Sequence, residues 1–80
     1  MDDAEILGQI NALVDEEHHL SRSHTGSALS AEELARLHDL ETTLDQCWDL
    51  LRQRRARRRA GQDPDSASTR PPGVVERYLQ

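Results

Sequence analysis

The chain of 80 residues contains no Phe and no Lys, and it has one Trp, one Tyr and one Cys. A β-sandwich or barrel needs many aromatic and β-branched side chains, so these shortages disfavour a fold built from strands. A single cysteine excludes a disulfide within the chain and a zinc site made of several cysteines. The apolar side chains are mostly Leu, Ile, Val and Ala, which suit contacts between helices, and this length allows one small core.

The first five residues, Met1-Asp2-Asp3-Ala4-Glu5, are acidic. A secretory signal instead begins with positive charge and continues with an apolar stretch. No apolar run approaches the roughly 20 residues that a membrane-spanning helix needs. Together with the lone cysteine, these features predict a cytoplasmic protein without a membrane segment.

Apolar residues recur at helical spacing from about residue 3 to residue 23: Ile6, Ile10, Leu13 and Leu20. Leu7 and Val14 widen this apolar face on one side, and Glu17 interrupts it. Asp2 or Asp3 can cap the first turn, because a carboxylate there accepts hydrogen bonds from free backbone N–H groups. We therefore expect a first helix over about residues 3–23.

A second helix is predicted from about residue 31 to residue 60. Ser30 and Glu33 have the spacing of a capping box, and Gly61 with Asp63-Pro64 can end the helix. Its expected apolar stripe is broadened by Leu40 and Cys47 and interrupted by Glu41. The main members of the stripe are Leu34, Leu37, Leu44, Trp48 and Leu51.

The short connection around Gly26, which suits a left-handed helix C-cap, predicts that the two helices form an antiparallel hairpin over residues 1–61. Pairing positions whose numbers sum to 54 brings the two stripes together: Leu20 with Leu34, Leu13 with Glu41, Ile10 with Leu44, and Ile6 with Trp48. Residues 62–80 are expected to form a linker and a C-terminal tail, in which a short helix docks Tyr78 and Leu79 near Trp48 or onto a partner. The fold class is all-α.

Three stretches of the C-terminal half have distinctive sequences: LDQCWDLLRQRRARR at Leu44–Arg58, AGQDPD at Ala60–Asp65 and RPPGVVE at Arg70–Glu76. They closely resemble a family of short actinobacterial proteins of unknown function. Residues 6–20 are similar to the opening helix of that family. The resemblance implies a helical cytosolic protein, and it implies no activity, substrate or catalytic residue.

Charge is strongly separated along the chain. Residues 1–51 carry 12 acidic and 2 basic side chains, whereas residues 52–59 carry six arginines: Arg52, Arg54, Arg55, Arg57, Arg58 and Arg59. Clustered guanidinium groups bind phosphates, so one hypothesis is a site for nucleic acid or another polyanion. The favoured interpretation is that they complement the C-terminal helix dipole and pair with Asp2, Asp3 and Glu5, because the chain is acidic overall and no aromatic residue lies among them to stack on bases.

Few residues offer site chemistry. Glu17, His38 and Glu41 could approach a two-metal arrangement if two hairpins formed a bundle, although seam glutamates that pair with arginine are the simpler interpretation. Cys47 has no His at helical spacing to activate it, and it is expected to be a small core residue. The sequence contains no phosphate-binding loop and no Ser-His-Asp or CxxC motif. We expect no enzyme activity, no cofactor and no resident metal.

A hairpin with one seam would leave part of its widened apolar face exposed. That face predicts a homodimer that completes a four-helix bundle, with contacts from Leu7, Val14, Leu40, Cys47 and Leu50, and with Trp48, Tyr78 and Leu79 docking the tail or the second chain. The expected function is a structural or adaptor role through protein contacts. Polyanion binding through residues 52–59 and metal binding in the bundle are the alternatives.

Overall fold

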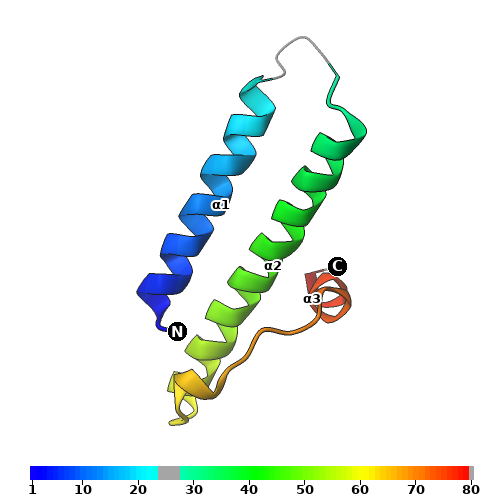
Figure 1. Cartoon of the computed structure of the whole chain (residues 1–80). Coiled ribbons are helices and arrows are strands. Elements are labelled where there is room, and N and C mark those ends of the chain that lie inside the picture. Colours follow the sequence, from blue (N-terminus) through cyan, green and yellow to red (C-terminus); the bar gives the residue numbers. More distant parts are fainter. Residues whose placement is uncertain (24–27, 80) are drawn as a thin grey trace.

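The computed structural model describes residues 1–23 and 28–79, and the side chains of residues 1–22 and 28–75. Helices α1 (Asp3–Ser23) and α2 (Ala31–Arg59) lie side by side and antiparallel (Figure 1). A 3-10 turn, η1 (Pro64–Ser66), follows α2, and a short helix, α3 (Pro72–Leu79), ends the tail. The all-α hairpin predicted from the sequence is confirmed, whereas the expected cap at Gly26 lies outside the described residues.

Both long helices begin at capping side chains. The Asp2 carboxylate accepts a hydrogen bond of 2.8 Å from the Glu5 backbone N–H, so Asp2 is the cap of α1. At the start of α2, the Ser30 hydroxyl accepts from the Glu33 N–H, and the Glu33 carboxylate accepts from the Ser30 N–H. The predicted capping box is therefore confirmed, and these contacts fix where each helix starts.

Helix α2 ends at a left-handed glycine, as the sequence predicts. Gly61 has a φ of 73°, and the N–H groups of Gly61 and Gln62 donate to the carbonyls of Arg58 and Arg57, at 3.1 and 2.7 Å. This pair of bonds is a Schellman motif, which satisfies carbonyls that the helix leaves free. It also turns the chain, so that the tail runs back along α2 (Figure 1).

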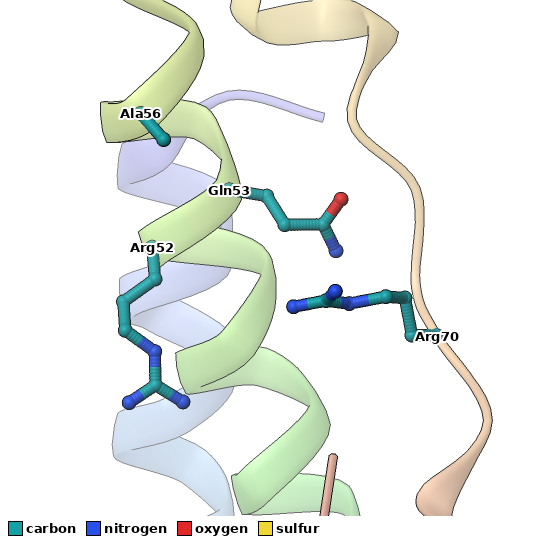
Figure 2. Close-up of a pocket in the computed structure, with 4 residues that line it drawn as sticks. All are labelled: Arg52, Gln53, Ala56 and Arg70. Atoms are coloured by element: carbon teal, nitrogen blue, oxygen red, sulfur yellow. The ribbon is translucent and has the colours of Figure 1, made fainter. Parts of the chain in front are cut away.

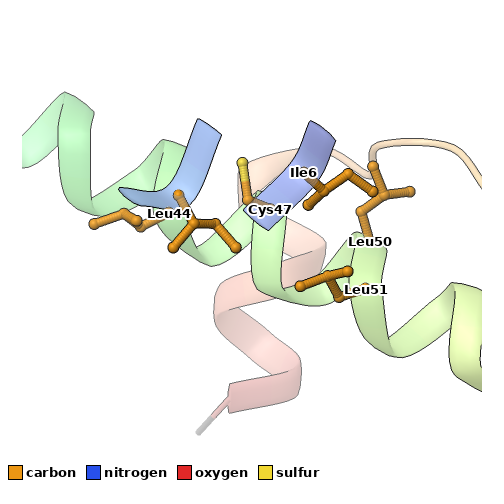
Figure 3. Packing of buried hydrophobic residues seen from close by; sticks show 6 residues of the cluster. Ile6, Leu44, Cys47, Leu50 and Leu51 are labelled. Atoms are coloured by element: carbon orange, nitrogen blue, oxygen red, sulfur yellow. The ribbon is translucent and has the colours of Figure 1, made fainter. Parts of the chain in front are cut away.

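The core lies between α1 and the middle of α2, where six side chains form one buried cluster: Ile6, Ile10, Leu44, Cys47, Leu50 and Leu51. Five of them are labelled in Figure 3, and Leu13, Val14 and Ala67 pack against the cluster. Ile10 and Leu44 share it, as the predicted register requires. Because the core is small, polar contacts at its edges also help to hold the helices and the tail in place.

Helix α2 is rotated about its axis relative to the prediction, so that the row of Leu40 and Cys47 faces inward instead of the row of Leu34 and Trp48. Leu40 and Cys47 are buried, whereas Trp48 is 45% exposed and Leu34 is 54% exposed. Ile6 therefore packs with Leu50 and Leu51 instead of Trp48. This arrangement leaves the Glu41 carboxylate in water, and burying it in the seam would cost several kcal/mol.

The tail lies against α2, on the side away from α1 (Figure 1). η1 and α3 both pack on α2, and Val75 of α3 is fully buried. The segment expected to be a linker thus covers part of the helix surface. Over the described ranges, no helix combines the length and hydropathy needed to cross a bilayer.

Substitution of two glycines tests the backbone conformation at the end of α2 and inside α1. A Cβ added at Gly61 meets no atom within 4 Å, but its positive φ strains any L-residue, so Gly61→Ala should lower the free energy of unfolding by about 1 kcal/mol. Gly8 lies exposed inside α1 and also has free space around it, so the matched Gly8→Ala should raise that free energy by roughly 0.5–1 kcal/mol. Urea denaturation measures both changes, and two shifts of the same sign would contradict this account.

Candidate functional site

A buried carboxylate lies where the tail crosses α2. The Asp49 side chain has no exposed surface, and it accepts two hydrogen bonds from the Arg70 guanidinium, that from Nε at 2.9 Å. Gln53, one turn further along α2, donates to the same carboxylate at 3.0 Å. Hydrogen bonding to Arg70 holds the pKa of Asp49 below its usual value, although burial acts in the opposite direction.

Two glutamines of α2 also bind the backbone of the tail. Gln53 donates to the Ser68 carbonyl at 2.8 Å, and Gln46 donates to the Arg70 carbonyl at 3.1 Å. Gln46, Asp49 and Gln53 are three and four residues apart, so they project from one side of the helix. This row, which we call the tail clamp, fixes residues 68–70 by their main chain and by the Arg70 side chain.

The second polar cluster joins three distant segments at the C-terminal end of α2. Arg54 is 4% exposed and donates to Asp3 at 2.5 Å and to Asp65 of η1 at 2.9 Å. Arg58 donates to Asp3 at 2.7 Å. Hydrogen bonds from Arg58 and Arg54 lower the pKa of Asp3 to about 2, and Arg54 also lowers the pKa of Asp65.

These ion pairs divide the arginine run. Arg54 is buried and bound to two carboxylates, so it is not available to a polyanion, and the hypothesis that all six arginines form an anion site is wrong for this residue. Arg58 pairs with Asp3, as the favoured interpretation predicts. Arg58 is exposed despite this pair, as are Arg52, Arg55 and Arg59, and Arg57 is half-buried.

A cavity of about 240 Å³ lies beside the tail clamp, lined by Arg52, Gln53, Ala56 and Arg70. Figure 2 shows that Gln53 and Arg70 extend toward each other from α2 and the tail. Because Arg70 is already bound to Asp49, the polar groups of this cavity serve the docking of the tail.

Within one chain, the proposed metal ligands form no metal-binding group among the described residues, and the two-hairpin arrangement stays a prediction. Glu17 is half-buried, His38 and Glu41 are exposed, and among the described residues no three His, Cys, Asp or Glu side chains are placed to share a metal ion. Cys47 lies in the core, where burial raises the pKa of its thiol and its Sγ lies 3.9 Å from Oε1 of Gln9. A protonated, buried thiol is a poor nucleophile.

The predicted contact residues for a dimer fall into two groups. Leu40, Cys47 and Leu50 are buried within the single chain, so the expectation that they remain exposed for a partner is wrong. Cys47 and Leu50 belong to the buried cluster between α1 and α2, and Ala67 of the tail packs on that cluster. The side chains of Tyr78 and Leu79 lie outside the described residues.

Leu7 and Trp48 do remain exposed, and helix geometry places them on one face. Leu7 follows the seam residue Ile6, and Trp48 follows the seam residue Cys47, so each is rotated by about 100° from its neighbour. In antiparallel helices, equal rotations lead to the same side of the hairpin. Half-buried Val14 lies in this direction too. We call this surface the Trp48 face. The tail clamp lies on a different side of α2, because Asp49 is rotated by about 100° from Trp48.

Asp49, Arg70 and Asp65 were missed in the sequence analysis. A charged residue inside a helix is usually solvent-exposed, so Asp49 gave no sign of burial. The available signal was the polar row of Gln46, Asp49 and Gln53 beside the apolar stripe, together with an arginine in the expected linker.

The tail clamp predicts an asymmetric double-mutant cycle. Arg70→Ala leaves a buried carboxylate without its cation and should lower the free energy of unfolding by about 2 kcal/mol. Asp49→Ala should lower it by less, because the Arg70 side chain is partly exposed and water can hydrate it. The double variant should lose less than the sum. Urea denaturation gives the coupling, and the exposed Arg36–Glu16 pair, whose coupling should be near zero, is the control. Independent effects of Asp49 and Arg70 would contradict the clamp.

The Asp3 cluster predicts a specific acid response. Since the folded-state pKa of Asp3 is about 2, below its ordinary value of 3.8, the two arginine contacts stabilise the fold fully above about pH 4 and lose this effect as the pH falls toward 2. In Asp3→Asn, the loss of stability between pH 5 and pH 2 should be shallower than in the parent. Denaturation curves across this range measure the slope. Asp15→Asn removes an exposed α1 carboxyl and is the control. A slope in Asp3→Asn as steep as that of the parent would contradict the assignment.

Comparison with known proteins matches residues 2–80 to a family model described as a protein of unknown function (DUF2630). An uncharacterized protein of Mycobacterium bovis and one of Mycobacterium tuberculosis are each 48% identical to the chain over 77 residues, which cover 95% of this chain and 88% of the relative. No solved structure matches the chain. The match spans both long helices, the tail clamp and the C-terminal helix, and the chain therefore belongs to the DUF2630 family of proteins of unknown function.

Proposed function

We propose that this protein is a small helical scaffold of the cytoplasm that acts through protein contacts, without catalysis of its own. The observation that carries the proposal is the Trp48 face, on which Leu7 and Trp48 are 43% and 45% exposed. Aromatic residues with apolar neighbours are enriched at protein interfaces, because burying them releases water from a large apolar area. The unpaired, buried Cys47 suits a reducing compartment.

The distribution of polar contacts supports the same role. The buried charged residues, Asp49 and Arg54, bind partners within the chain and hold the tail and the helix ends. A rigid body results, because α2 is fixed to both α1 and the tail. On such a body, an exposed apolar face presents a preformed surface, and little conformational entropy is lost when a partner binds.

Polyanion binding is the second candidate, and Arg55, Arg57 and Arg59 are the residues that would carry it. Two of the six arginines in the run are already paired with Asp3, and the preceding 51 residues carry a net charge of −10, which repels phosphates. The two proposals differ in their response to salt. Nucleic-acid binding weakens steeply as salt rises, whereas contacts through the apolar face do not.

Photo-crosslinking from position 7 tests the proposal. A photoreactive residue in place of Leu7, in the native cell, should yield covalent adducts with protein, and the adducts should fall at least tenfold when Trp48→Asp is added, because a buried unpaired carboxylate opposes association. Mass spectrometry identifies the attached chain.

Val74→Asp is the matched control, because Val74 is as exposed as Trp48 but belongs to α3 and is not one of the residues that define the Trp48 face. It should leave the adducts unchanged. The proposal is wrong if position 7 gives no protein adduct, or if the two aspartate substitutions reduce the adducts equally. Adducts with nucleic acid alone would favour the second candidate.

A further inference from the structure

The outer surface of α2 carries a row of residues spaced by seven, and this row continues through the Trp48 face. Its members are Leu34, Glu41, Trp48 and Arg55, all of which are exposed. Residues seven apart on a helix lie nearly above one another, about 10 Å apart along the axis. The row therefore places an acidic group on one side of Trp48 and a basic group on the other, at equal distances.

This arrangement is self-complementary under a two-fold rotation. If a second α2 packs antiparallel on the first, with the two-fold axis at Trp48, the two tryptophans meet and Glu41 of each copy faces Arg55 of the other. Neither residue has an ion pair within the described part of its own chain. Both side chains are thus available for a contact between chains.

We propose that the occupant of the Trp48 face is a second copy of this chain, bound antiparallel through α2 with Glu41–Arg55 pairs on both sides of Trp48. This inference rests on the proposed function and names the partner of the same face. Trp48 supplies the apolar centre, and the two charge pairs set the direction and register of packing. Leu7 and Val14 extend the apolar contact beside α2.

The tail clamp stays out of this interface. Asp49 follows Trp48 by one residue and is rotated by about a further 100°, away from the Trp48 face, where Arg70 covers it. A contact centred on Trp48 can therefore form without breaking the Asp49–Arg70 hydrogen bonds. The resulting dimer has four long helices in contact across the Trp48 face, two from each hairpin.

Charge reversal tests the register. Glu41→Arg places two arginines at each contact, and Arg55→Glu places two carboxylates there. The dimer of each variant alone should therefore have a dissociation constant about tenfold or more above that of the parent. A mixture of the two variants restores both contacts, because Arg at position 41 then faces Glu at position 55, and the other contact keeps its native pair. Sedimentation equilibrium should show heterodimers in the mixture and mainly monomers in each variant alone.

Controls separate charge from folding. Circular dichroism should show parental helix content in both variants, because the two positions are exposed, and Asp15→Arg, on the far side of α1, should leave the dimer unchanged. Trp48→Ala should also yield monomers, and dilution of the parent should shift its tryptophan emission to longer wavelength as Trp48 becomes hydrated.

A parent chain that is monomeric at 100 µM overturns the inference, as does a mixture that remains monomeric. The proposed function is judged separately by crosslinking at position 7. Adducts with a different protein alone would support the scaffold role and overturn self-association, whereas the absence of protein adducts would overturn both.

Discussion

A carboxylate without solvent contact can stay ionised inside a protein only if hydrogen-bond donors and a cation surround it, and Asp49 imposes this requirement on α2. Arg70 and Gln53 are the groups that meet it. Because Arg70 lies 21 residues further along the chain, satisfying Asp49 forces the tail to return over α2. The two-helix hairpin thereby becomes a three-layer structure in which α2 is the central element.

The same logic operates at the end of the hairpin. The last two turns of α2 extend beyond the core cluster, where a row of arginines would repel one another if left alone. Asp3 from the start of α1 and Asp65 from η1 bind Arg54 there, and Asp3 also binds Arg58. The charge separation visible in the sequence is thus partly neutralised by folding, and the N-terminus, the end of α2 and the tail are tied together at one point.

The sequence predicts helix ends, which depend on neighbouring residues, better than it predicts contacts between residues far apart in the chain. The helix bounds, the Ser30 capping box and the Gly61 terminus depend on neighbouring residues, and each was predicted and confirmed. The rotation of α2 was not predicted. One row runs through Leu40 and Cys47, and the next row, one residue further along, runs through Glu41 and Trp48. Tertiary packing decides which of the two faces α1. The Asp49–Arg70 pair could not be derived either, since its partners meet only after the tail has folded back.

The rotation of α2 also determines which surface is left for association. With α1 on one side and the tail on another, the remaining side carries Glu41, Trp48 and Arg55. A parallel pairing of two such helices would set Glu41 beside Glu41 and Arg55 beside Arg55, which is repulsive at both levels, whereas an antiparallel pairing makes both levels attractive. The charges beside Trp48 therefore select the orientation of packing, while the apolar side chains supply the attraction. Because the residues of the tail clamp are not those of the Trp48 face, folding of the monomer and association of two copies depend on different residues.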